Sequence, residues 1–197
     1  MGAMTWVLLA VGLLAVFWAV GAYNRLVRLK NAIANAFGQI DVQLKRRYDL
    51  IPNLVEVARK YLAHEAQTLE AVIAARNQAR SAEQTAAGSP LNAGALGALA
   101  GAEQMLGGAL GRLFAVAEAY PDLKADQTMR ELSEELSSTE NRIGFARQAY
   151  NDHVLEFNDA AAQFPTLIVA RLFNFQPQAM LASTTSEAER ASVKVSF

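Results

Sequence analysis

Residues 5–22 read TWVLLAVGLLAVFWAVGA, a run of eighteen residues that contains no charge and no proline. A helix of this length and composition lies at the lower limit of what crosses the hydrocarbon core of a bilayer. Aromatic rings flank the run, and such rings favour the membrane–water interface. We therefore predict an N-terminal transmembrane anchor over residues 1–23. Its membrane-spanning side chains include Trp6, Leu9, Leu13, Phe17 and Trp18.

A cleaved signal peptide is the alternative interpretation of this run. Residues 19–21 (Ala-Val-Gly) resemble a small-x-small cleavage site. A signal peptide, however, begins with a basic region, whereas residues 1–4 (MGAM) contain neither Lys nor Arg. The sequence therefore favours a retained anchor.

The basic residues near the span all follow it. Arg25, Arg28 and Lys30 come directly after the run, and no Lys or Arg precedes it. The positive-inside rule then predicts that the N-terminus lies outside and that the rest of the chain lies in the cytoplasm. These three side chains either face anionic lipid headgroups or serve only as a topology signal.

The remainder of the chain is predicted to be all-α, with the transmembrane helix continuing into an antiparallel bundle of long helices. Apolar residues recur at steps of three and four, which is the helical period. The first stretch continues the span to about residue 44, and a second is predicted from Asp49 and Pro52 to Gln84. A third runs over 91–120, with Ser89 as its cap and Pro90 in its first turn. We assign residues 24–175 to the bundle and residues 176–197 to a polar C-terminal tail.

The fourth stretch, residues 129–164, has the most regular pattern. Its apolar positions keep alternating three- and four-residue steps and therefore require partner helices. They are Met129, Leu132, Leu136, Thr139, Ile143, Ala146, Tyr150, Val154, Phe157, Ala161 and Phe164.

The third stretch is rich in Gly and Ala. Gly97/Gly101 and Gly107/Gly111 have the G-x-x-x-G spacing that allows close helix approach, so we expect this helix to be tightly packed. A second membrane span is disfavoured, because Glu103 and Arg112 would place charge at mid-bilayer.

Two sets of polar residues are candidates for contacts between subunits. The first is an amide ladder with a spacing of four, which forms either a solvated face or a lateral contact. The second pairs a basic cluster with an acidic one, either within a subunit or between subunits. The candidate interface residues are Asn31, Asn35, Gln39, Gln43, Lys45, Arg46, Arg47, Glu131, Glu134 and Glu135.

No catalytic or cofactor-binding motif is present. The chain contains no cysteine, and its two histidines, His64 and His153, lack the spacing of a metal site. No phosphate-binding loop or nucleophile elbow occurs. A net charge of −1 predicts no nucleic-acid partner. We therefore expect a protein that is not an enzyme, with no metal and no cofactor.

Four blocks of the sequence resemble the LemA family. They are YNRLVRLKNAIANAFGQIDVQLKRRYDLIPNLVEVARKYLAHE (23–65), GRLFAVAEAYPDLKA (111–125), ENRIGFARQAYN (140–151) and FPTLIVARLFNF (164–175). The resemblance implies a bacterial inner-membrane protein with an antiparallel helical bundle and no established enzymatic activity. It also implies a role in membrane organisation, since one family member is associated with magnetosome membrane formation.

Two functions follow as hypotheses. The first is a membrane-anchored scaffold that self-assembles as a homo-oligomer on the lipid bilayer and organises or remodels it. The alternative is a monomeric tether, or adaptor, that recruits a cytoplasmic protein partner.

Overall fold

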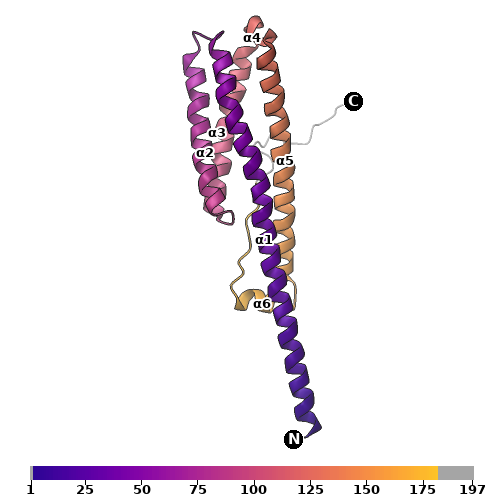
Figure 1. Ribbon diagram of the computed structural model, residues 1–197. Coiled ribbons are helices and arrows are strands. Elements are labelled where there is room, and N and C mark those ends of the chain that lie inside the picture. Colours follow the sequence, from indigo (N-terminus) through magenta and orange to yellow (C-terminus); the bar gives the residue numbers. More distant parts are fainter. Residues whose placement is uncertain (1, 182–197) are drawn as a thin grey trace, which may run out of the picture.

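The computed structural model describes residues 2–181 and confirms an all-α fold (Figure 1). Six helices follow one another along the chain, and no strand occurs within 2–181. They are α1 (Ala3–Arg59), α2 (Ala66–Gly88), α3 (Ala93–Ala117), α4 (Pro121–Ala125), α5 (Gln127–Ala162) and α6 (Thr166–Leu172). The predicted tail, 176–197, lies outside the described residues beyond residue 181.

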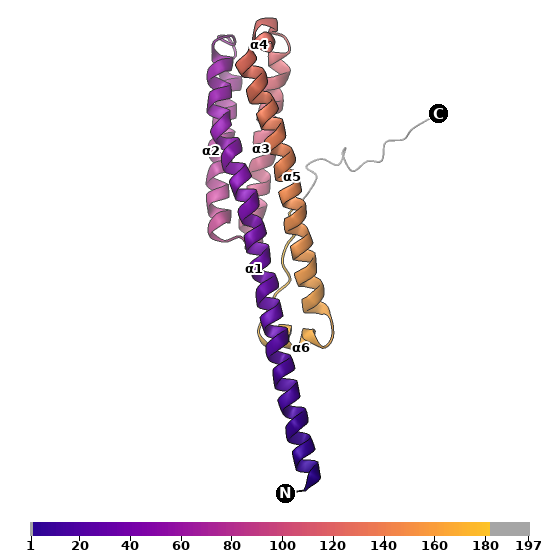
Figure 2. The same cartoon turned by 45° about the vertical axis from the view of Figure 1, so that its right-hand side comes forward.

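The helices form a bundle that narrows toward the N-terminus. α1, α2, α3 and α5 run antiparallel to their chain neighbours in the half that is distant from the N-terminus (Figure 2). α5 packs mainly along α1, and α2 packs along both α3 and α1. Because α2 and α3 are shorter, the next section contains the α1–α5 pair with α6 and the chain that follows it, and the first part of α1 extends alone (Figures 1 and 2).

α1 is a single helix of 57 residues, which at about 1.5 Å per residue is roughly 86 Å long. The predicted boundary between anchor and bundle therefore lies inside one element. The predicted new helix at Asp49 and Pro52 is wrong, because α1 continues through Pro52 to Arg59. The actual break is the turn at residues 60–65, which separates α1 from α2.

Pro52 is accommodated by a hydrogen bond from another helix. A proline inside a helix lacks the N–H that would bond the carbonyl four residues earlier. That carbonyl belongs to Tyr48, and it accepts a hydrogen bond of 3.0 Å from Arg76 Nε of α2. Since this partly buried acceptor is satisfied, α1 need not end there.

Side chains cap the beginnings of α3 and α5. Asn92, not the predicted Ser89, caps α3: its Oδ1 accepts from the Ala95 N–H at 3.0 Å. Asp126 caps α5 by accepting from the Met129 N–H at 2.9 Å, and its other oxygen accepts from the Tyr61 hydroxyl at 2.9 Å. These bonds hold the pKa of Asp126 below its ordinary value. The second one ties the α1–α2 turn to the start of α5.

The predicted α5 seam forms much of the core. Ile143, Tyr150, Val154 and Phe157 are fully buried, and Leu132 and Ala146 are partly buried against them. Phe164 departs from the prediction, since α5 ends at Ala162 and leaves the Phe164 ring 81% exposed.

Candidate functional site

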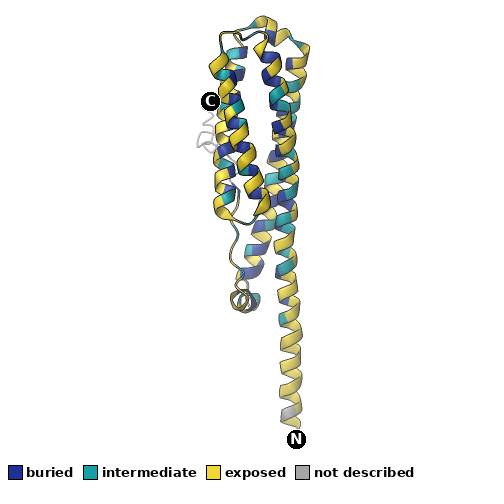
Figure 3. Cartoon of the chain, turned by 60° about the vertical axis from the view of Figure 1, so that its left-hand side comes forward, coloured by how far each residue is buried: buried dark blue, intermediate teal, exposed yellow. Residues whose placement is uncertain are grey.

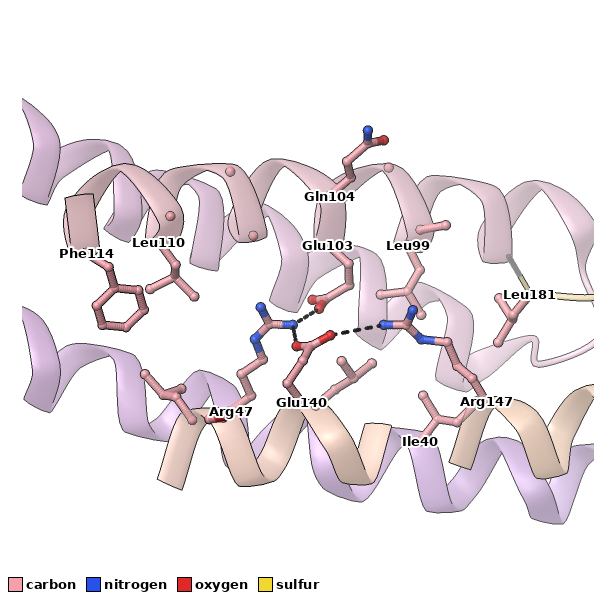
Figure 4. A pocket seen from close by; sticks show the side chains of 18 of the residues that line it. Ile40, Arg47, Leu99, Glu103, Gln104, Leu110, Phe114, Glu140, Arg147 and Leu181 are labelled. Carbon is pink, nitrogen blue, oxygen red and sulfur yellow. Dashed lines mark hydrogen bonds and ion pairs between the residues drawn. The ribbon is translucent and has the colours of Figure 1, made fainter. Parts of the chain in front are cut away.

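A groove runs between α3 and α5, with α1 as its floor, and encloses about 780 Å³ (Figure 4). It exists because α3 packs on α2 and makes little contact with α5. Its lining is mainly apolar, with Leu99, Leu110 and Phe114 contributed by α3 and Leu136 by α5. Leu181, the last described residue, lies at one end of the groove.

The glycines of α3 keep this groove open. Gly101, Gly107, Gly108 and Gly111 line it, and a Cβ built at any of them would meet no atom within 4 Å. Within residues 2–181, the predicted close helix approach at the two G-x-x-x-G spacings does not occur. α3 instead packs along α2, and its glycines leave space on the side of the groove.

One guanidinium connects the three helices that surround the groove. Arg47 Nη1 of α1 lies 2.8 Å from Glu103 Oε2 of α3 and 2.6 Å from Glu140 Oε2 of α5. The Tyr48 hydroxyl donates to the other Glu103 oxygen at 2.5 Å. Arg147 Nη2 approaches Glu140 Oε1 at 3.9 Å (Figure 4). Burial, together with the Glu103 charge, raises the pKa of the Tyr48 phenol well above its ordinary value.

The cluster predicted to join subunits is used largely inside the chain. Arg47 is 7% exposed and bonded as above, so its assignment to a subunit interface is corrected to an internal ion pair. Arg46 Nη2 lies 2.5 Å from Glu135 Oε1, and that pair also lies within the chain. Glu131 and Glu134 are exposed on the same helix as Glu135.

Lys45 belongs to a third arrangement of charge, between α1 and α2. Its Nζ lies 2.6 Å from Asp41 Oδ2 and 3.7 Å from Glu83 Oε1. Glu83 is 1% exposed, and burial followed by its hydrogen bond to Asp41 raises its pKa to about 7. Burial alone would raise the pKa of Asp41, but hydrogen bonds from Glu83 and Lys45 hold it below its ordinary value. Glu83 is therefore the carboxyl group of the pair that carries a proton below about pH 7.

The predicted membrane-facing residues lie on a surface that the bundle leaves uncovered. One helix in the described part of the chain, α1, is long and apolar enough to cross a membrane, and its apolar window has a mean hydropathy of 2.1 with none of it buried. Trp6, Leu9, Leu13, Phe17 and Trp18 are all exposed, at 42–71% (Figure 3). The apolar core helix of a soluble protein would be covered, so this exposure distinguishes the segment from one.

The other predicted surface residues also lie along α1. Arg25, Arg28 and Lys30 are exposed just beyond the span, as are Asn31, Asn35 and Gln39 of the amide ladder. Gln43, the last rung, is half-buried, and its Oε1 has no hydrogen-bond partner within residues 2–181.

No metal-binding constellation of three or more His, Cys, Asp or Glu side chains occurs among the described residues. His64 lies in the turn between α1 and α2. His153 Nδ1 lies 3.9 Å from Glu156 Oε2 on the exposed surface of α5.

Two features of the site were not predicted. The pairing of Glu103 is the first, although a charge on a buried stripe is itself a signal that a partner must exist. The groove is the second, and no sequence pattern indicates it, because the glycine spacing of α3 is typical of a surface that packs against another helix.

Comparison with known proteins gives consistent results. The family model of the LemA family matches residues 36–197. Magnetosome protein MamQ of Magnetospirillum gryphiswaldense is 27% identical over 169 residues, which cover 78% of this chain and 62% of that protein. MamQ 2 of Paramagnetospirillum magneticum is 26% identical over 172 residues, with the same coverage, so the chain spans less than two thirds of these relatives. Protein LemA of Metamycoplasma hominis is 29% identical over 180 residues, covering 91% of this chain and 77% of that protein.

Proposed function

The chain belongs to the LemA family, and from this premise we propose that it is a membrane-anchored helical scaffold that self-assembles and organises or remodels the membrane. That it is a membrane-associated helical protein follows from the family, the magnetosome relatives and the exposed apolar helix. Self-assembly and membrane remodelling are the proposed part. The proposal includes no catalytic step and no cofactor.

The observation that carries the proposal is the continuity of α1. The same helix contains the apolar segment and supplies core residues from Leu26 to Ala58. No linker separates the two parts, so the orientation of the bundle is coupled to that of the span. A tether only has to hold its partner within a certain distance of the membrane, so it tolerates a flexible linker. An ordered array instead needs subunits that all have the same orientation relative to the membrane.

The outer face of α1 supports lateral association. Asn31, Asn35 and Gln39 present amides at a spacing of four, close to the membrane, where neighbouring subunits would meet. Polar side chains at such a seam fix the register between helices. In this proposal the amide ladder, and not the basic cluster, forms the contact between subunits.

A monomeric adaptor is the second candidate function, and the groove between α3 and α5 favours it. This mainly apolar groove of about 780 Å³, with the glycines of α3 along one side, could accept a segment of a cytoplasmic protein partner. Lipid nanodiscs distinguish the two functions, because a scaffold forms multimers where an adaptor remains a single copy.

Site-specific crosslinking in proteoliposomes tests the scaffold directly. The chain contains no cysteine, so each introduced one reports a single contact. Gln39→Cys should form disulfide-linked dimers, while Gln78→Cys, an equally polar exposed position on α2, should remain monomeric. Electron microscopy of the same sample should show arrays, rings or tubes. A single copy per nanodisc together with no crosslink at Gln39 would replace the scaffold with the adaptor.

A further inference from the structure

A cluster of exposed apolar side chains surrounds α6, at the end of the bundle nearest the predicted span. Phe164 is 81% exposed, Leu172 75%, Ile168 58% and Phe173 53%. Monomeric soluble proteins rarely gather large apolar side chains on one surface without a partner. We call these four residues the α6 patch.

The sequence of α6 explains why it has two faces. Val169 and Ala170 are buried against the bundle, where α6 contacts α1 and α5. Ile168 and Leu172, four residues apart, lie together on the opposite face, one helical turn from each other. α6 is therefore a short helix with two apolar faces, and the second face has no cover among residues 2–181.

A left-handed turn at Asn174 ends α6. Asn174 adopts a left-handed conformation with φ 54°, which asparagine tolerates better than most residues. The Phe175 N–H then bonds the Ala170 carbonyl at 2.9 Å, and the Asn174 N–H bonds that of Arg171 at 3.3 Å. This is the Schellman arrangement, which turns the chain back on the helix it ends.

That turn places two aromatic rings on Tyr23. The Phe173 and Phe175 ring centroids lie 4.8 and 5.6 Å from the Tyr23 centroid, and Phe175 also contacts Phe157 of α5 at 6.3 Å. Tyr23 directly follows the apolar run 5–22. The α6 patch is therefore held at the level where the span leaves the bilayer, which Figures 1 and 2 both show as α6 beside α1 at the end of α5.

We propose that the α6 patch inserts into the headgroup–acyl boundary of the leaflet on the bundle's side and forms a second membrane contact beside the span. This inference rests on the anchor in the proposed function and adds a site to it. Lipid is the occupant because the patch is continuous with the exposed surface of α1. Arg171 of α6 and Arg25, two residues after Tyr23 in α1, are both exposed and supply charge for lipid phosphates. Insertion depth for interfacial helices is about 5–10 Å, within reach of side chains at the level of Tyr23.

A second contact changes what the anchor does. A span alone leaves the bundle free to tilt and rotate about the membrane normal, within the limits of mismatch. With α6 inserted on one side of α1, the bundle stands at one angle, and apolar volume enters one leaflet only. Both effects serve an array that shapes its membrane.

Spin labels on single cysteines in the full-length chain test the insertion in phosphatidylcholine–phosphatidylglycerol vesicles. Phe164→Cys and Leu172→Cys report the patch. Phe145→Cys is the matched control, because this phenylalanine is 73% exposed on α5, seventeen residues before Ala162, the last residue of the helix. Leu13→Cys reports the span. For each spin label, two collision rates are measured. One is with oxygen, which concentrates in lipid, and the other is with a water-soluble nickel complex.

The patch labels should resemble the Leu13 label, with nickel collisions reduced at least about twofold relative to the Phe145 label. Circular dichroism confirms that each variant remains helical. Patch labels as accessible to nickel as the Phe145 label, with the Leu13 label still in lipid, overturn the insertion and leave the anchor intact. Patch labels shielded from both probes also overturn it, because protein then covers the patch. The Gln39 crosslink reports self-assembly independently of either result.

Discussion

Arg76 Nε of α2 donates a hydrogen bond of 3.0 Å to the backbone carbonyl of Tyr48 in α1. That carbonyl would otherwise be a partly buried acceptor without a donor, because Pro52 occupies the position that would supply one. One side chain from a neighbouring helix thus allows α1 to pass a proline without a break. The helical continuity of the last turns of α1, from Tyr48 to Arg59, is supported by this bond.

Removing the Arg76 side chain should therefore destabilise the bundle. Arg76→Ala leaves the Tyr48 carbonyl unsatisfied and should cost about 1–3 kcal/mol in chemical denaturation monitored by circular dichroism. Arg80→Ala, an exposed arginine on the same helix, is the control and should change stability by less than about 0.5 kcal/mol. Pro52→Ala restores the missing N–H, so in that background the Arg76→Ala cost should shrink. An unchanged cost in the double variant would show that Arg76 acts in some other way.

The ion pair beneath the groove gives a second prediction. Arg47→Met leaves Glu103 buried without its charge partner and should cost about 3–5 kcal/mol. Arg46→Met removes a half-exposed pair with Glu135 and should cost less than about 1 kcal/mol.

Pairing inside the chain also predicts how charge reversal acts. Reversing Lys45, Arg46 and Arg47 together to Glu should unfold the bundle and not merely separate subunits. Circular dichroism and size analysis of that variant distinguish these outcomes. A variant that remains folded but becomes monomeric would instead indicate that these cations form a contact between subunits.

The carboxyl pair predicts how stability depends on pH. The folded state holds a proton on Glu83, whose pKa is about 7 against an ordinary 4.5, so this contribution is complete below about pH 4.5 and is lost as the pH rises through 7. Asp41, with its lowered pKa, adds stability above pH 3.8 that stays constant over this range. Between pH 5 and pH 8 the wild type should lose roughly 1–3 kcal/mol.

Glu83→Gln isolates that effect. The amide can still donate to Asp41 but does not titrate, so the stability of this variant should be nearly flat from pH 5 to pH 8. Glu70→Gln, an exposed position on the same helix, should keep the wild-type profile. An equal slope in Glu83→Gln would assign the pH dependence to other groups.

The topology of the chain gives a further prediction. Because Arg25, Arg28 and Lys30 all follow the span, a reporter fused after Phe197 should be active in the cytoplasm. Intact mass of the purified protein should retain residues 1–22, as an anchor requires. A periplasmic reporter would reverse the orientation without removing the anchor, whereas a mass that begins after residue 21 would establish cleavage.

The sequence by itself determined the features that depend on one helix at a time. The apolar run 5–22 is local, and so is the seam through Ile143, Tyr150 and Phe157, because a three- and four-residue step defines one face of a helix whatever lies opposite. The family blocks added the antiparallel bundle. Local signals were less reliable at helix ends: Pro52 is a start signal in isolation, and the start of α3 falls at Asn92 because that side chain reaches a free N–H.

Only the tertiary structure decided which face meets which. Helical period identifies the buried side of α3 but not its partner, so the packing of α3 on α2 and the open space beside its glycines appear only once the helices are placed. The same holds for Arg47, whose charge could have paired within or between chains until Glu103 and Glu140 were brought within 2.8 Å of it. Contacts between helices depend on relative rotation and separation, and these are set by the packing of all the helices together and by no single stretch of sequence.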